Sequence, residues 1–126
     1  MLPRLFLGVF LALAGCGAFD TEGVRSISVE TLRTDLDAKK YPILVDVRTG
    51  GEFRAGHVPG AVNLPLDELP ARIDELKGYK GKEIAVICQS GSRSTSAARI
   101  LAEQGYRVAN VSGGTGAWIR SDFPTE

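Results

Sequence analysis

The chain has 126 residues, with 15 lysines and arginines against 15 aspartates and glutamates, two cysteines and one histidine. Compact domains cluster near roughly 100–150 residues, so this length excludes two independent hydrophobic cores. The formal net charge of zero provides no long-range field that would attract phosphate backbones, which argues against a nucleic-acid partner. Two cysteines are also too few for a disulfide scaffold.

The N-terminus has the pattern of a targeting signal. Arg4 precedes a ten-residue apolar run, Leu5 to Ala14, which fits the about 7–15 residues of a secretory signal and is shorter than the roughly 20 of a membrane-spanning helix. The run ends in Leu-Ala-Gly-Cys, which resembles the lipobox of bacterial lipoproteins. The resemblance implies a signal peptide over residues 1–15, followed by a lipidated Cys16 and a tether, residues 16–25. The alternatives are an ordinary signal peptide with an incidental cysteine, or a buried first strand.

Lipidation would decide where the protein works. Acyl chains on Cys16 would hold it at a membrane, since each buried CH₂ contributes about 0.8 kcal/mol. We therefore expect an extracytoplasmic protein bound to a bacterial membrane, on the periplasmic side where there are two membranes. By resemblance to other lipoproteins, Gly17 after the cysteine favours the outer membrane.

Residues 26–126 alternate β-branched runs with amphipathic ones, as in an α/β domain. The first predicted helix covers 29–38 after Ser28 as N-cap. Ile43 to Val45 is continuously apolar, which is typical of a strand buried on both faces. A shorter strand over 61–64 follows, and then a helical stripe from Leu66 to Leu76.

The second half of the chain continues the alternation. Residues 84–87 form another apolar strand, followed by a small-residue loop and a helix of about a dozen residues that Gly105 ends. A last strand over 108–111 precedes a short terminal helix around residues 117–119. These patterns predict an α/β fold with a small, mostly parallel, five-stranded sheet and helices on both faces, although they locate only four of the five strands.

Cys88 is the candidate nucleophile because it ends a buried strand just before a helix, where the working residues of open α/β sheets gather. The loop after it contains Gln89, Ser90, Gly91, Ser92, Arg93 and Ser94. Such small residues allow successive backbone N–H groups to converge on an anion. Together with the helix dipole and the arginine, they would lower the thiol pKa from about 8.5 into the roughly 3.5–7.5 range of activated cysteines. The alternative is an inert, buried structural cysteine.

Four motifs between residues 27 and 118 resemble those of single-domain rhodaneses. They are Asp46-Val47-Arg48; Glu52-Phe53 with Gly56-His57-Val58-Pro59-Gly60-Ala61; CQSGSRS from Cys88; and Gly113-Gly114 with Ala117-Trp118. The resemblance implies a sulfurtransferase in which Cys88 takes the outer sulfur of a small donor such as thiosulfate, carries it as a persulfide held by the loop amides, and gives it to cyanide or a thiol. We expect a monomer that needs no cofactor and no metal.

Two departures from the rhodanese pattern bear on substrate and local structure. Some rhodanese loops carry two cations, whereas this loop has only Arg93, so thiosulfate is not expected to be the best donor. Thr49-Gly50-Gly51 replaces more helical residues and predicts a looser turn.

Two other functions stay open on the same scaffold. Cysteine phosphatases and arsenate reductases would use the loop for an oxyanion, but phosphatases place an arginine six positions after the nucleophile, whereas Arg93 is five after Cys88. The shorter loop suits a sulfur atom better than a phosphoryl group. The remaining possibility is a binding module without catalysis.

Supporting residues have less specific interpretations. Asp46 should accept loop amides or pair with an arginine, and either orients the active loop or acts as a structural cap. Arg48 and Glu52 are predicted to form an ion pair, the alternative being two solvated side chains. His57 is expected to fix a turn, because it lacks companion metal ligands, and Trp118 to lie in the core.

Overall fold

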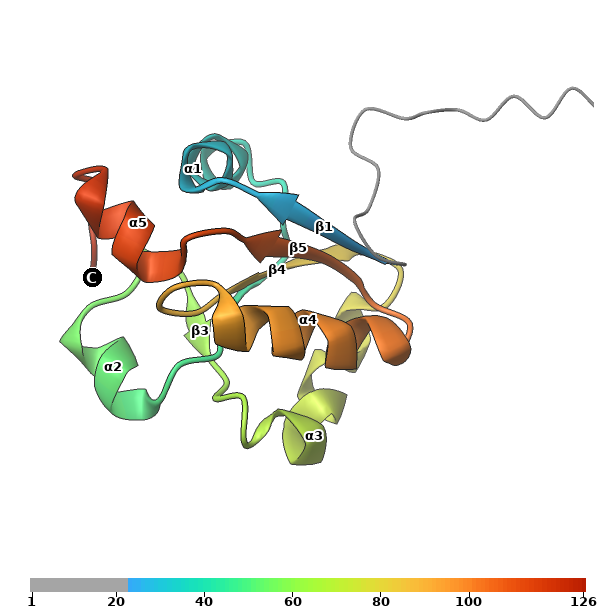
Figure 1. Cartoon of the computed structure of the whole chain (residues 1–126). Helices are drawn as coiled ribbons and strands as arrows, with labels where there is room; N and C mark the ends of the chain where they lie inside the picture. The colour runs from blue at the N-terminus through green and yellow to red at the C-terminus, as the bar shows by residue number, and fades with distance from the viewer. Residues whose placement is uncertain (1–22) are drawn as a thin grey trace, which may run out of the picture.

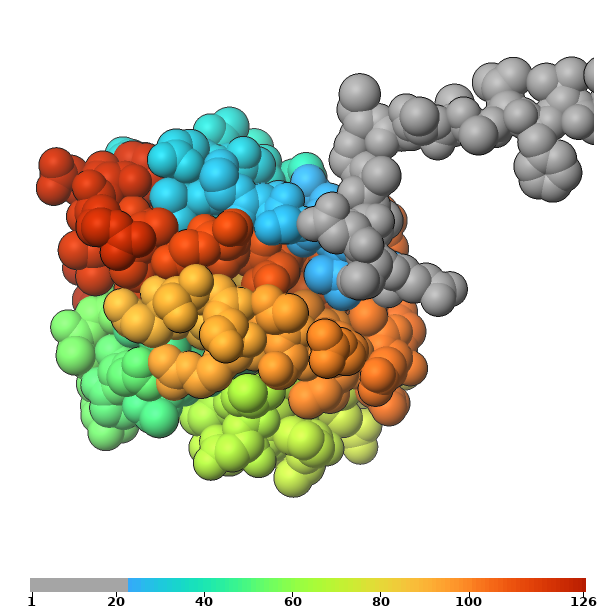
Figure 2. All heavy atoms as spheres, viewed as in Figure 1, coloured from blue at the N-terminus to red at the C-terminus, as the bar shows by residue number. Residues whose placement is uncertain are grey.

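The computed structural model describes residues 23–126, so the predicted signal peptide, Cys16 and residues 17–22 of the predicted tether lie outside the described residues (Figure 1 and Figure 2). The elements are β1 (Val24–Ile27), α1 (Val29–Asp37), β2 (Leu44–Asp46), α2 (Gly50–Ala55), β3 (Val62–Asn63), α3 (Leu69–Arg72), the 3₁₀ helix η1 (Ile73–Tyr79), β4 (Glu83–Ile87), α4 (Ser92–Glu103), β5 (Arg107–Val111) and α5 (Gly114–Arg120). Among these helices, none combines the length and the apolar character that crossing a bilayer requires.

The five strands form one sheet in the order β1-β5-β4-β2-β3, and each neighbouring pair is parallel. The alternation of side chains along β4 divides the buried residues into two clusters, one on each face of the sheet. Ile84 and Val86 face one cluster, which α3, η1 and α4 cover, while Ala85 and Ile87 face the other, which α1 and α5 cover (Figure 1). The predicted α/β fold with helices on both faces is thereby confirmed, and β4 lies at the centre of the sheet, buried on both sides.

The predicted helix over the 66–76 stripe is present in a modified form. It consists of one turn of α-helix, α3, with Pro70 in its first turn, followed by the 3₁₀ helix η1. The apolar spacing serves both helix types, because Leu69 and Leu76 are both buried beneath them. The pattern therefore located the buried face correctly but not the change of helix type.

Two segments differ from the sequence prediction. Val24 and Arg25, assigned above to the tether, belong to β1, which supplies the missing fifth strand by pairing with β5. The predicted looser turn at Thr49-Gly50-Gly51 is wrong, because Thr49 caps the helix α2 through a capping box with Glu52. In that box the Thr49 hydroxyl accepts the Glu52 amide at 3.3 Å, and a Glu52 carboxylate oxygen accepts the Thr49 amide at 3.2 Å.

Candidate active site

Cys88 follows β4 directly, at the carboxyl edge of the sheet and between two other strand ends. Asp46 ends the adjacent β2 in register with Ile87, and the loop after Val111 of β5 leads into α5. The Cys88 side chain is 1% exposed and packs in the cluster under α4. Cys88 is the first residue of the loop that joins β4 to α4.

Polar groups of the loop surround the sulfur. The Gly91 amide donates to Cys88 Sγ at 3.0 Å, and the Ser94 hydroxyl lies 3.4 Å from the same sulfur. Gly91, the last residue of the loop, is the N-cap residue of α4. Its φ of +107° is a left-handed conformation that favours glycine. Ser90 and Ser94 contribute their amides. Ser92 is exposed at the first position of α4.

These hydrogen bonds favour ionisation of the thiol. Burial alone would raise the pKa of Cys88, but the bonds from the Ser94 hydroxyl and from the amides of Ser94, Gly91 and Ser90 outweigh it and hold the pKa below its ordinary value. With the thiol protonated, the Ser94 hydroxyl donates instead to the Gly91 carbonyl at 3.1 Å. This hydroxyl can therefore turn to the sulfur when the proton leaves.

The first turn of α5 fixes the backbone of the same loop. Thr115 and Gly116 donate their amides to the carbonyls of Cys88 and Gln89, at 2.8 and 3.0 Å. The helix can approach so closely because Gly114 has no side chain: a Cβ there would lie 2.4 Å from the Cys88 carbonyl oxygen. Gly113-Gly114 was visible in the sequence as a family motif, but its contact with the nucleophile's own carbonyl was not.

Asp46 and Arg48 form a buried ion pair that reaches the active loop. Arg48 Nη2 and Nε lie 2.7 and 3.0 Å from Asp46 Oδ2 and Oδ1, and the Arg48 amide also donates to Asp46 at 3.0 Å. Arg48 Nη1 then donates to the Gln89 side chain at 3.2 Å. Asp46 thus pairs with an arginine rather than with loop amides, and Arg48 links it to the side chain of Gln89 in the active loop. The side chain of Asn63, which sequence reasoning missed, donates to the carbonyls of both residues of the pair.

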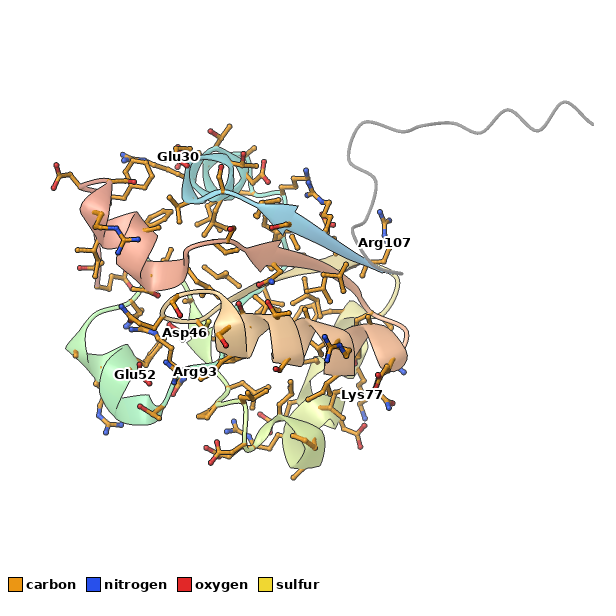
Figure 3. All side chains as sticks on the ribbon, viewed as in Figure 1. Glu30, Asp46, Glu52, Lys77, Arg93 and Arg107 are labelled. Atoms are coloured by element: carbon orange, nitrogen blue, oxygen red, sulfur yellow. The ribbon has the colours of Figure 1, made fainter. Side chains whose placement is uncertain are left out.

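Arg93 does not bond to the sulfur but pairs with Glu52 of α2. Its Nη1 and Nη2 donate to Glu52 Oε1 and Oε2 at 2.6 and 2.8 Å, and the two side chains meet in Figure 3. The predicted ion pair between Arg48 and Glu52 is therefore wrong. Arg48 pairs with Asp46, and Glu52 pairs with Arg93. Arg93 lowers the pKa of Glu52 to about 2, chiefly by this hydrogen bonding. The hydrogen bonds to Glu52 are the main reason that the pKa of Arg93 is raised, and the negative charges of Glu52 and, to a smaller extent, Cys88 add to the rise.

A cavity of about 380 Å³ lies against the loop at Arg93. Its walls are Val47, Thr49, Pro65, Leu66, Asp67 and Arg93. Val47 lines this cavity, donates its amide to the carbonyl of Ile87, the residue before Cys88, and lies in the same hydrophobic cluster as Cys88. A larger cavity, about 470 Å³, lies along α4 toward the start of β5 and includes neither Cys88 nor its hydrogen-bond partners.

His57 and Trp118 have structural roles. The His57 ring stacks on Phe53 with centroids 3.7 Å apart, its Nδ1 bonds the Phe53 carbonyl, and its main chain pairs with that of Glu126. Trp118 is 2% exposed and donates to the Pro124 carbonyl, as expected for a core residue. Within residues 23–126, no group of three or more histidine, cysteine or acidic side chains is arranged to hold a metal ion.

Comparison with known proteins gives a consistent picture. The family model described as a rhodanese-like domain matches residues 28–121. A protein named sulfurtransferase from Allochromatium vinosum is 38% identical over 102 residues, which cover 80% of this chain and 94% of that protein. Thiosulfate sulfurtransferase PspE of Escherichia coli is 37% identical over 70 residues, covering 56% of this chain and 67% of that protein.

Among solved structures, a rhodanese-related protein from Thermoplasma volcanium superposes with a TM-score of 0.73 at 32% identity. The match covers 80% of this chain and 96% of that one. The family match includes Cys88, its loop, both ion pairs and the glycines that hold the loop backbone. The chain therefore belongs to the rhodanese-like domain family and is similar to proteins named as sulfurtransferases.

Proposed function

We propose that this protein is a sulfurtransferase that carries sulfane sulfur as a persulfide on Cys88. The observation that carries the proposal is the convergence of the Gly91 amide and the Ser94 hydroxyl on a buried sulfur whose pKa is lowered. A thiolate of this kind needs no separate general base. His57 makes no hydrogen bond to Cys88 among the described contacts, in keeping with that mechanism.

The reaction has two displacement steps. In the first, the Cys88 thiolate attacks the outer sulfur of the donor and forms an S–S bond. The donor's own bond to that sulfur breaks, and its electron pair leaves with the remainder, which is sulfite when the donor is thiosulfate. In the second, a cyanide or thiol acceptor attacks the terminal sulfur of the persulfide. The electron pair of the S–S bond then returns to Cys88 Sγ, which restores the thiolate.

The loop would stabilise the persulfide by the same contacts that stabilise the thiolate. The terminal sulfur of a persulfide is anionic, so it needs several donors around one centre. The loop amides supply them, and the twelve-residue helix α4 places its positive dipole end at the same point. The amides of Thr115 and Gly116 bind the carbonyl oxygens of Cys88 and Gln89, so the backbone of the loop is fixed at these two residues.

The mass of the intact protein tests the proposal. After incubation with thiosulfate or an organic thiosulfonate and removal of the donor, we expect a gain of one sulfur atom, about 32 Da, on the activated thiolate. Cyanide should remove it with formation of thiocyanate. Cys88→Ser is the control and should gain nothing. Hydrolysis of an aryl phosphate or reduction of arsenate, without any gain of sulfur, would instead establish the oxyanion chemistry. A protein that gains no sulfur and has neither of these activities would support the binding module.

We also propose that the protein is lipidated on Cys16 and acts outside the cytoplasm at a bacterial membrane. The lipobox-like end of the N-terminal apolar run supports this proposal. Cys16→Ala should move the protein from the membrane fraction to the soluble fraction while persulfide formation on Cys88 continues. If this variant sediments with membranes as the native protein does, the N-terminus holds the protein by another means.

A further inference from the structure

Both arginines beside the active loop have their charge balanced by a carboxylate. Arg93 is bound at both terminal nitrogens by Glu52, and Arg48 is bound at Nη2 and Nε by the fully buried Asp46. The Glu52 pair is the more accessible one, since its side chains are each about one-third exposed. Neither guanidinium is left as a free cation for an anionic donor.

The cavity beside the loop also offers little positive charge to an anionic donor. Val47, Pro65 and Leu66 give it an apolar wall, and Asp67 adds a carboxylate to the same lining as Arg93. With Arg93 neutralised by Glu52, the charged groups at this wall sum to a negative value. A dianion would be repelled there, whereas a donor with an apolar carbon group next to its sulfur would find a surface on which to pack.

We propose that Glu52 is a specificity-determining residue that turns the enzyme away from dianionic thiosulfate and toward organic sulfur donors carrying one negative charge or none. The inference rests on the sulfurtransferase function proposed above. Glu52 acts through Arg93, by occupying the guanidinium that would otherwise bind the sulfonate oxygens of thiosulfate. The transferred sulfur and the attack by Cys88 are the same for both donor classes, so the effect lies in binding.

The test compares two donors that differ by one charge and transfer the same sulfur, thiosulfate and methanethiosulfonate. The latter gives its outer sulfur to the Cys88 thiolate and leaves as methanesulfinate, which takes the electron pair. Glu52→Gln removes the charge and keeps an oxygen that can accept the Thr49 amide, so the cap of α2 is retained. Arg93 then has a free positive charge toward the cavity.

We expect Glu52→Gln to raise kcat/KM for thiosulfate about tenfold and for methanethiosulfonate about threefold. Methanethiosulfonate carries half the charge of thiosulfate, so its attraction to the freed Arg93 contributes half the binding free energy. The change should appear mainly in KM and should shrink in 0.5 M NaCl, where the Debye length is only about 4 Å.

Two variants control for charge and for structure. Glu75→Gln is the matched control, because Glu75 also binds an arginine at two nitrogens, Arg72 in α3, and its loss changes the net charge equally on a different helix. Its donor preference should equal that of the native protein. Glu52→Asp keeps the charge and should keep the native preference.

The outcomes separate this inference from the proposed function. A rise in the ratio of thiosulfate to methanethiosulfonate kcat/KM in Glu52→Gln alone supports it. An unchanged ratio, with persulfide still formed, overturns it and leaves the sulfurtransferase function in place. An equal loss with both donors also overturns it, because Glu52 would then only hold α2 against α4. A native protein that accepts sulfur from neither donor overturns the proposed function itself.

Discussion

Gly114→Ala should disable the active loop although the residue never touches substrate. Gly114 has φ +61°, and an added Cβ would lie 2.4 Å from the Cys88 carbonyl oxygen and 2.7 Å from the carbonyl carbon and oxygen of Gln89. These are backbone atoms, so α5 or the loop must move. The amide bonds of Thr115 and Gly116 to that backbone would lengthen or break as a result.

The cost can be worked from these contacts. The left-handed backbone costs an alanine roughly 1–2 kcal/mol, overpacking adds about 1–3 kcal/mol, and each lost hydrogen bond adds about 0.5–1.5 kcal/mol. With two hydrogen bonds at risk, we therefore expect a loss of roughly 3–8 kcal/mol in the free energy of unfolding. Persulfide formation should also slow in the fraction that stays folded, because the loop amides shift away from Sγ.

Gly105→Ala is the matched control for this substitution. Gly105 has φ +89° but no atom within 4 Å of the added Cβ, so it carries the backbone strain without the clash. Urea unfolding should give a loss of only about 1–2 kcal/mol for this variant, and its persulfide yield should match that of the native protein. Equal losses in the two variants would refute the reasoning, since they would show that contact between α5 and the loop contributes nothing.

Three other perturbations follow from the site. Ser94→Ala should raise the pKa of the Cys88 thiol, so the midpoint of its alkylation rate against pH should move upward. Asp46→Asn leaves the buried Arg48 charge without its partner and should cost about 3–5 kcal/mol in urea unfolding at pH 7. Glu52 has its pKa lowered from 4.5 to about 2 on folding, so its stabilisation is complete above pH 4.5 and is lost as the pH falls toward 2. Acid titration of stability in Glu52→Gln should lack this component.

Sequence periodicity located the central strands of the sheet and the edge strand β3, but it did not locate the other edge strand, β1. The apolar runs that lie in and beside β2 and β4, Ile43 to Val45 and Ile84 to Ile87, are uninterrupted because both faces of a parallel sheet are covered. A solvent-exposed tether does not show such a pattern. Edge strand β1 carries Arg25 and Ser26 between its apolar ends, and Arg25 is held by Glu83, 58 positions later in the chain. A strand whose polar side chains bind residues far along the chain has the sequence of a linker, and only the structure identifies those residues.

The sequence also did not reveal which charged side chains form ion pairs with one another. Arg48 and Glu52 are four residues apart, so a local ion pair was the simplest expectation from the sequence. The chain folds so that Arg48 faces inward onto Asp46, while Glu52, committed to the cap of α2, faces Arg93 of α4. The partner of Glu52 is fixed by the approach of two helices, α2 and α4, which the spacing along the chain does not encode.

This pairing also bears on the choice between sulfur and phosphate chemistry. A phosphoryl group carries charge on several oxygens and needs a free arginine as well as amides, whereas a persulfide places its charge on one sulfur that amides alone can surround. Around Cys88, the guanidiniums of Arg48 and Arg93 are both bound to carboxylates, while the amides of Gly91 and Ser94 point at Sγ. The pairing of both arginines with carboxylates, as much as the length of the loop, favours sulfur over a phosphoryl group as the group that Cys88 would carry.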